Sequence, residues 1–157
     1  MNKKTLVWFI IFLSILGVIL TSYLSWIHYN PPAPNEELIG CLTGSGCNAV
    51  TTSEYSYFLG IPVAVLGLAA YIIIILLSII FLFLKNEEKR KEQIIMVILL
   101  LSFIGTLFQG YLTYISGTII RAYCSLCIMS EIFITLIFVL TLFLNKEKLK
   151  RSWNKLE

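Results

Sequence analysis

Hydrophobic residues form four long runs along the chain, separated by shorter polar segments. Each run has 22 to 24 residues, and three of the four contain no charged side chain. At about 1.5 Å per residue, a helix of this length crosses a hydrocarbon core of about 30 Å. A helix also satisfies its own backbone hydrogen bonds, for which lipid offers no partner. The pattern therefore predicts membrane-spanning helices over Leu6–Ile27, Ile61–Leu84, Ile94–Ile115 and Tyr123–Leu144.

The composition agrees with a membrane protein. Of the 157 residues, 58% are hydrophobic and 13% are charged, about half the charged fraction of roughly 25% found in soluble domains. This excludes a soluble globular protein, a disordered tail and a nucleic-acid-binding module. We expect an all-α membrane protein, a four-transmembrane-helix bundle that forms one membrane-embedded domain over residues 1–157. The first run exceeds the 7–15 apolar residues typical of a signal peptide and lacks a clear cleavage site, so we expect a retained helix.

The basic residues predict the orientation. Eleven of the twelve Lys and Arg residues lie at the N-terminus, in the segment between the second and third runs, or in the C-terminal tail; Arg121 is the exception. The positive-inside rule then places both termini in the cytoplasm of a multi-pass protein of the cell (inner or plasma) membrane. The long loop His28–Gly60 and the short turn Ser116–Ala122 face outward. Because orientation accounts for the basic residues, no nucleic-acid partner is expected.

All four cysteines fall in or beside these outward segments. Cys41 and Cys47 lie in the long loop, on either side of a glycine-rich segment, and Cys124 and Cys127 form a Cys-x-x-Cys motif where the fourth helix begins. Disulfides persist in extracytoplasmic compartments. An even count in two closely spaced pairs indicates two dithiol/disulfide couples.

Three interpretations of these pairs differ in chemistry. Static disulfides would stabilise little, because a three-residue separation closes too small a loop to remove much unfolded-state entropy. A zinc site of four thiolates fits Cys-x-x-Cys, but the five residues between Cys41 and Cys47 are wide for such a site. Thiol–disulfide exchange fits best, since the start of a helix favours the thiolate that attacks disulfides.

At this point the chain resembles a known family. The residues that carry the resemblance are Cys41, Cys47, Ser53, the stretch Phe58–Ala64 and the motif Cys124-Ser125-Leu126-Cys127. In this order they resemble the bacterial members of the vitamin K epoxide reductase family, over about Leu6–Leu144. The resemblance implies a four-helix bundle around a quinone, either ubiquinone or menaquinone. It also implies a membrane oxidoreductase that reoxidises a thioredoxin-like extracytoplasmic protein and passes the electrons to that quinone.

The same resemblance implies roles for single residues. Cys41 would exchange disulfides with the outside partner, Cys47 would relay to Cys124, and Cys127 would face the quinone. Ser53 would lie near the quinone ring and hydrogen-bond toward its oxygen, although without the resemblance an ordinary helix-capping or turn serine is the preferred interpretation. Many bacterial relatives continue into a fused thioredoxin-like domain, whereas this chain continues into a short basic tail, so the partner is expected in trans.

Glu131 is a departure from the animal reductases, which have a tyrosine one turn after Cys-x-x-Cys. An ionisable residue inside a membrane helix is costly and usually marks function. Four residues past Cys127, it lies on the same helical face, where it could bind or protonate the quinone, or simply contact water. This difference favours disulfide generation over the alternative of vitamin K epoxide reduction.

Two further alternatives remain. Another class of four-helix, quinone-linked thiol oxidase carries its Cys-x-x-Cys in the first outward loop, the reverse of the order here. The other is a non-enzymatic membrane scaffold with two structural disulfides, which would not cycle with a quinone. Phe108, Tyr111 and Tyr114 of the third run either wall a quinone pocket or pack between helices.

Overall fold

The structure is a computed structural model that describes residues 3–31, 47, 50, 53, 56–58, 60–84 and 87–153, with side chains up to residue 146. Its long elements are four helices: α1 (Lys3–Tyr29), α3 (Val63–Phe83), α4 (Glu88–Ile115) and α5 (Ser125–Trp153). Two short strands, β1 (Tyr57–Phe58) and β2 (Ile61–Pro62), precede α3, and a π-helix, η2 (Ser116–Ile120), extends α4.

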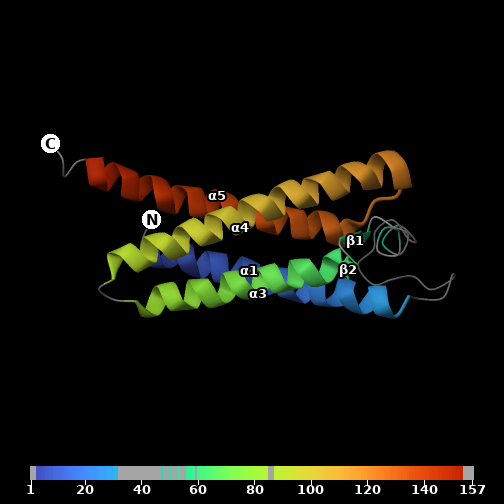
Figure 1. The fold of residues 1–157 in the computed structure, drawn as a ribbon, viewed down its shortest axis with the longest axis horizontal. Coiled ribbons are helices and arrows are strands. Elements are labelled where there is room, and N and C mark those ends of the chain that lie inside the picture. The colour runs from blue at the N-terminus through green and yellow to red at the C-terminus, as the bar shows by residue number, and fades with distance from the viewer. Residues whose placement is uncertain are drawn as a thin grey trace.

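Within the described residues, four helices are long and apolar enough to cross a membrane. They run along one common axis (Figure 1), with α1 packed on α3 and α5, and α4 packed on α5, while α3 and α4 contact each other less. The prediction of an all-α, four-helix membrane bundle with a long connection between its first two membrane helices is confirmed.

The bundle has two distinct ends (Figure 1). At one end lie the start of α1, the end of α3, the start of α4 and the end of α5. At the other end lie β1, β2 and the turn from α4 to α5, which carries Cys124 and Cys127. We call these the opposite end and the cysteine end.

The helices differ from the hydrophobic runs at their termini. α3 begins at Val63 rather than at Ile61, because Ile61 and Pro62 pair with β1 in an antiparallel hairpin. Gly60, just before β2, has a φ of 81°, a backbone conformation that residues other than glycine rarely adopt. α4 begins earlier than the apolar run, at Glu88, because the helix continues through charged residues beyond the expected hydrocarbon region.

The opposite end has a filled core. Its buried residues are aliphatic or aromatic and come from all four long helices, namely Leu6, Val7, Ile10, Ile11, Tyr71, Ile74, Phe81, Ile95, Ile98, Ile134, Ile137 and Leu144. Two buried hydroxyls in this part bond within their own helix: Ser14 donates to the carbonyl of Ile10 (2.8 Å) and Thr141 to that of Ile137 (2.7 Å). Bonds of this kind satisfy a hydroxyl without help from another helix. Ser78 is also buried here, and its hydroxyl has no hydrogen-bond partner among the described residues.

Candidate active site

A cavity of about 340 Å³ lies between the four long helices at the cysteine end. This volume falls in the range of about 300–1,000 Å³ that is typical of small-molecule sites. Its walls are largely apolar, with a few hydroxyl and amide groups among them. At the cysteine end the rings of Phe58 (β1) and Phe108 (α4) meet edge to face, with centroids 5.2 Å apart, and both line the cavity.

The cavity reaches the outer surface of the bundle on the side of α4. Ile104 lines the cavity, yet 61% of this residue is exposed on the bundle surface. The α3 part of the wall includes three small residues, Ala64, Gly67 and Ala70, beside larger ones such as Leu66. The α4 wall of the cavity at Ile104 is therefore also part of the outer surface of the bundle.

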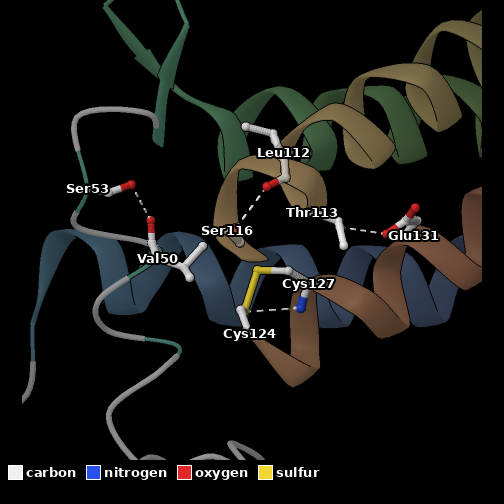
Figure 2. Close-up of a disulfide and its surroundings, with 8 residues drawn as sticks. All are labelled: Val50, Ser53, Leu112, Thr113, Ser116, Cys124, Cys127 and Glu131. Atoms are coloured by element: carbon white, nitrogen blue, oxygen red, sulfur yellow. Dashed lines mark hydrogen bonds between the residues drawn. A yellow bond between two sulfur atoms is a disulfide. The ribbon is translucent and has the colours of Figure 1, made fainter. Parts of the chain in front are cut away.

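Cys124 and Cys127 form a disulfide at the start of α5, with Cα atoms 5.2 Å apart. Cys124 directly precedes the first residue of the helix, and the backbone N–H of Cys127 donates to its sulfur at 3.2 Å (Figure 2). The first N–H groups of a helix have no partner within the helix. One of them therefore stabilises negative charge on the Cys124 sulfur once the disulfide opens.

The two sulfurs face different surroundings. Cys124 is 2% exposed and packs with Leu24, Leu126 and Cys47 in one buried group, the sulfur cluster. Cys127 lies at the edge of this cluster and lines the cavity, whereas Cys124 does not line it. The disulfide therefore joins a buried sulfur environment to the cavity.

Cys47, which comes from the long loop, belongs to the sulfur cluster. It is fully buried (0% exposed) and disulfide-bonded. Cys41, the other member of the expected loop pair, lies outside the described residues. The fold thus brings together Cys47 and Cys124, which are 77 positions apart in the sequence.

Ser53 also lines the cavity. Its hydroxyl donates to the carbonyl of Val50 at 2.8 Å, and its carbonyl accepts from the hydroxyl of Ser56 at 2.6 Å (Figure 2 shows the first bond). Ser53 therefore has a turn bond and a place at the cavity wall, while its expected hydrogen bond to a quinone stays a prediction.

Glu131 does not line the cavity directly. Its carboxylate accepts a hydrogen bond of 2.7 Å from the hydroxyl of Thr113 on α4 (Figure 2), and Thr113 is a cavity residue. Of the aromatic residues proposed for the wall, Phe108 lines the cavity, whereas Tyr111 and Tyr114 are exposed on the bundle surface.

Sequence reasoning missed several cavity residues, and two of them make polar contacts with another helix. Thr113 is one, and Tyr71 is the other: its hydroxyl donates to the carbonyl of Ser130 (2.8 Å) and lies 3.2 Å from the hydroxyl of Ser130. A Cβ at Gly17 would overlap the Tyr71 ring, so α1 and α3 approach closely there. The available signal for Tyr71 was one of the few polar side chains in the second apolar run, with a glycine in the first run.

A scan against protein families matches residues 8–142 to the vitamin K epoxide reductase family. The chain belongs to the vitamin K epoxide reductase family. The matched range includes all four cysteines, Ser53 and Glu131. A search of curated proteins finds no match.

Family membership establishes the general chemistry. The protein is a multi-pass membrane oxidoreductase that carries out thiol–disulfide chemistry, and vitamin K epoxide reductase family proteins generally use quinone-type electron carriers and thiol redox partners. This sets aside a non-enzymatic scaffold with structural disulfides.

Proposed function

We propose that this protein reoxidises a thioredoxin-like extracytoplasmic protein, supplied in trans, and passes the electrons to a membrane quinone, ubiquinone or menaquinone. One observation carries the proposal: a single disulfide has one sulfur in a buried cluster with Cys47 and the other at the wall of a cavity. A relay needs two such faces, one for the protein thiols and one for the electron acceptor.

The cavity suits a quinone head group. It is largely apolar, it has the volume of a small-molecule site, and it reaches the lipid side at Ile104. Gln109 brings an amide to the wall that can donate to a carbonyl oxygen, and the Ser53 hydroxyl can donate there once it turns away from the Val50 carbonyl. When bound, the quinone supplies an acceptor for two electrons and two protons.

The relay consists of exchanges in which each thiolate attacks one disulfide sulfur. The reduced partner attacks the Cys41–Cys47 disulfide and leaves with its own disulfide. Cys47 thiolate then attacks Cys124, which frees Cys127 thiolate at the cavity wall. Cys41 next attacks Cys47, which restores the loop disulfide and frees Cys124. When the Cys124–Cys127 disulfide reforms, these residues give up two electrons and two protons, the number that reduces one quinone to hydroquinone.

The distribution of the basic residues along the sequence predicts on which side of the membrane the cysteines lie. With the basic residues in the cytoplasm, both termini and the α3–α4 connection lie inside, and the cysteine end faces out of the cell membrane. The chain acts as a single membrane-embedded domain in this proposal. Impermeant thiol labelling of reduced whole cells should modify Cys41, while Cys47, which is buried in the sulfur cluster, should label much more slowly. Labelling of Cys41 only after the membrane is broken would reverse the orientation.

Glu131 separates the proposal from vitamin K epoxide reduction. Where animal reductases carry a tyrosine hydroxyl, this chain carries a carboxyl group hydrogen-bonded to Thr113. Vitamin K epoxide reduction is the second candidate function. Assays of epoxide reduction and of quinone reduction, run on the same protein, distinguish the two functions.

The deciding experiment uses the purified full chain in lipid nanodiscs with a water-soluble quinone analogue. Given a reduced thioredoxin-like protein, the wild type should consume quinone and partner thiols in a one-to-one ratio of quinone to dithiol. Cys47→Ser should block oxidation of the protein partner but leave quinone reduction by a small dithiol. Absence of quinone reduction in the wild type would overturn the proposal.

A further inference from the structure

A carboxyl group lies inside the bundle one helical turn deeper than the cysteine motif. Glu131 of α5 is partly buried and faces α4, where its Oε2 accepts a 2.7 Å hydrogen bond from Thr113 Oγ1 (Figure 2). Its Oε1 lies beside Gly110, where a Cβ would be 3.7 Å away. The carboxylate is therefore held against α4, and an ionisable residue in this position is usually functional.

Thr113 stands between this carboxylate and the cavity. Thr113 lines the cavity and Glu131 does not, so the hydroxyl is the contact between the two. Other cavity hydroxyls direct their protons to backbone carbonyls: Thr21 to Gly17 at 2.8 Å, and Ser116 to Leu112 at 2.9 Å. Among cavity hydroxyls in the described part of the chain, Thr113 alone donates to a carboxylate.

We propose that Glu131 delivers a proton through the Thr113 hydroxyl to the quinone oxygen that is being reduced. This inference rests on the proposed function. A charged, doubly reduced quinone would be strongly unfavourable in an apolar cavity, so a proton source must be within reach. A carboxyl outside the cavity with a hydroxyl at its wall meets that need without placing a charge against the apolar head group.

The proton transfer balances. When Glu131 is protonated, it donates to Thr113 Oγ1 and the Thr113 hydroxyl turns its own hydrogen toward the quinone oxygen. The Thr113 hydrogen then passes to the quinone, the Glu131 proton replaces it on Thr113 Oγ1, and Glu131 becomes a carboxylate that again accepts from Thr113. The electrons come from Cys124 and Cys127 as their disulfide reforms. The two protons released by this dithiol equal the two taken up by the quinone, and one of them restores the Glu131 carboxyl through water at the cysteine end.

The first test measures quinone reduction by a small dithiol in the full chain. Glu131→Gln keeps the shape of the side chain but carries no transferable acid proton, and Thr113→Val keeps the shape but loses the hydroxyl. Each should lower kcat by about 100-fold, the lower end of general-acid effects, with KM for quinone unchanged. The double variant should be no slower than either single variant, because both break the same path. Thr113→Ser should restore most of the rate.

Thr106→Val is the matched control. Thr106 lies on the same helix, is partly buried and donates to the carbonyl of Ser102 at 2.9 Å, but it does not line the cavity. It should keep the wild-type kcat. Equal slowing by Thr106→Val and Thr113→Val, or wild-type rates in Glu131→Gln, would overturn the proton path while leaving quinone reduction by the wild type intact.

Two readouts are independent of turnover. In a Cys124→Ser background, the remaining Cys127 thiolate should give a charge-transfer absorption with bound quinone, and adding Glu131→Gln should leave that absorption unchanged. Loss of the absorption would mean that Glu131 only builds the site. In quinone-free protein, Thr113→Val should shift the infrared carboxyl band that Glu131→Gln removes, and an unshifted band would show that the two residues are not coupled.

Discussion

The two ends of this bundle use the same helices in opposite ways. Along the inner face of α3, the opposite end presents Ile74 and Phe81, which are buried in a filled core. One to three turns earlier, the same face presents Ala64, Gly67 and Ala70, which line a cavity of about 340 Å³. Tyr71 belongs to both regions, because it lines the cavity and packs in the core. Large aliphatic side chains hold the helices together, and small ones open space beside the reactive sulfur.

Hydroxyl groups follow the same division. In the filled core, Ser14 and Thr141 bond to carbonyls of their own helix. At the cysteine end some of them reach other elements: Tyr71 bonds to α5, and Thr113 bonds to Glu131. Polar groups are costly in lipid unless they are satisfied, so cross-helix bonds beside a cavity indicate a site rather than packing alone. Stability should therefore depend on the opposite end and catalysis on the cysteine end.

The largest expected effect is the loss of the cavity sulfur. Cys127→Ser should reduce quinone reduction by about 1,000-fold or more, because the variant lacks the thiolate at the cavity wall. Its unfolding midpoint in detergent should change little. Turnover is measured as loss of quinone absorbance with a small dithiol as reductant.

Spectra of two variants sharpen this result. Cys124→Ser leaves Cys127 alone at the cavity, where it should give a visible charge-transfer absorption with quinone. Cys127→Ser leaves Cys124 in the sulfur cluster, where it should give none. Absorption only in Cys127→Ser would reverse the roles of the two sulfurs.

The next effect concerns stability at the opposite end. Ile137 is fully buried there, so Ile137→Ala should destabilise the bundle by about 1–3 kcal/mol. This is less than the usual 2–5 kcal/mol, because in lipid the loss of packing remains but the transfer from water is largely absent. The KM for quinone should be unchanged.

Leu136→Ala is the control for this substitution, because Leu136 is the neighbouring residue and faces outward, 44% exposed. It should cost much less stability, measured by denaturation in mixed micelles. Equal losses in the two variants, or a raised KM in Ile137→Ala, would contradict the division between the two ends.

A smaller effect is expected from filling the cavity. Ala70→Leu adds three carbon atoms at the cavity wall and should raise the KM for quinone about 10-fold, or about 1.4 kcal/mol in binding. Ala69→Leu adds the same atoms to a neighbouring residue that is exposed on the bundle surface and should leave KM unchanged. Unchanged KM in both variants would place quinone elsewhere.

The smallest effect is expected at Ser53. Ser53→Ala removes one hydroxyl at the wall and its 2.8 Å bond to the carbonyl of Val50. We expect KM for quinone to rise about 3-fold, since one neutral hydrogen bond contributes about 0.5–1.5 kcal/mol. Ser53→Thr, which keeps the hydroxyl, should restore most of the affinity. No difference between these variants would leave Ser53 as a turn residue only.

The sequence by itself determined the number of membrane helices and the segment that carries each cysteine pair. Both follow from local properties: long apolar runs must be helical in lipid, and Cys-x-x-Cys is a contiguous motif. Hydropathy could not set the helix ends, because Glu88 and its charged neighbours are helical beyond the apolar run. Hydropathy also could not predict that α3 begins only at Val63. The reason is a hairpin, which depends on pairing between Tyr57–Phe58 and Ile61–Pro62.

Tertiary structure alone decided which side chains share a space. Spacing places Cys124, Cys127 and Glu131 along one helical face, but it does not say that Cys124 turns to Cys47 while Cys127 meets a cavity. Nor does it pair Glu131 with Thr113, which is 18 residues away on another helix. These contacts depend on the rotation and approach of whole helices. Small residues such as Gly17 set that approach, and their effect appears only once the facing side chain, here Tyr71, is known.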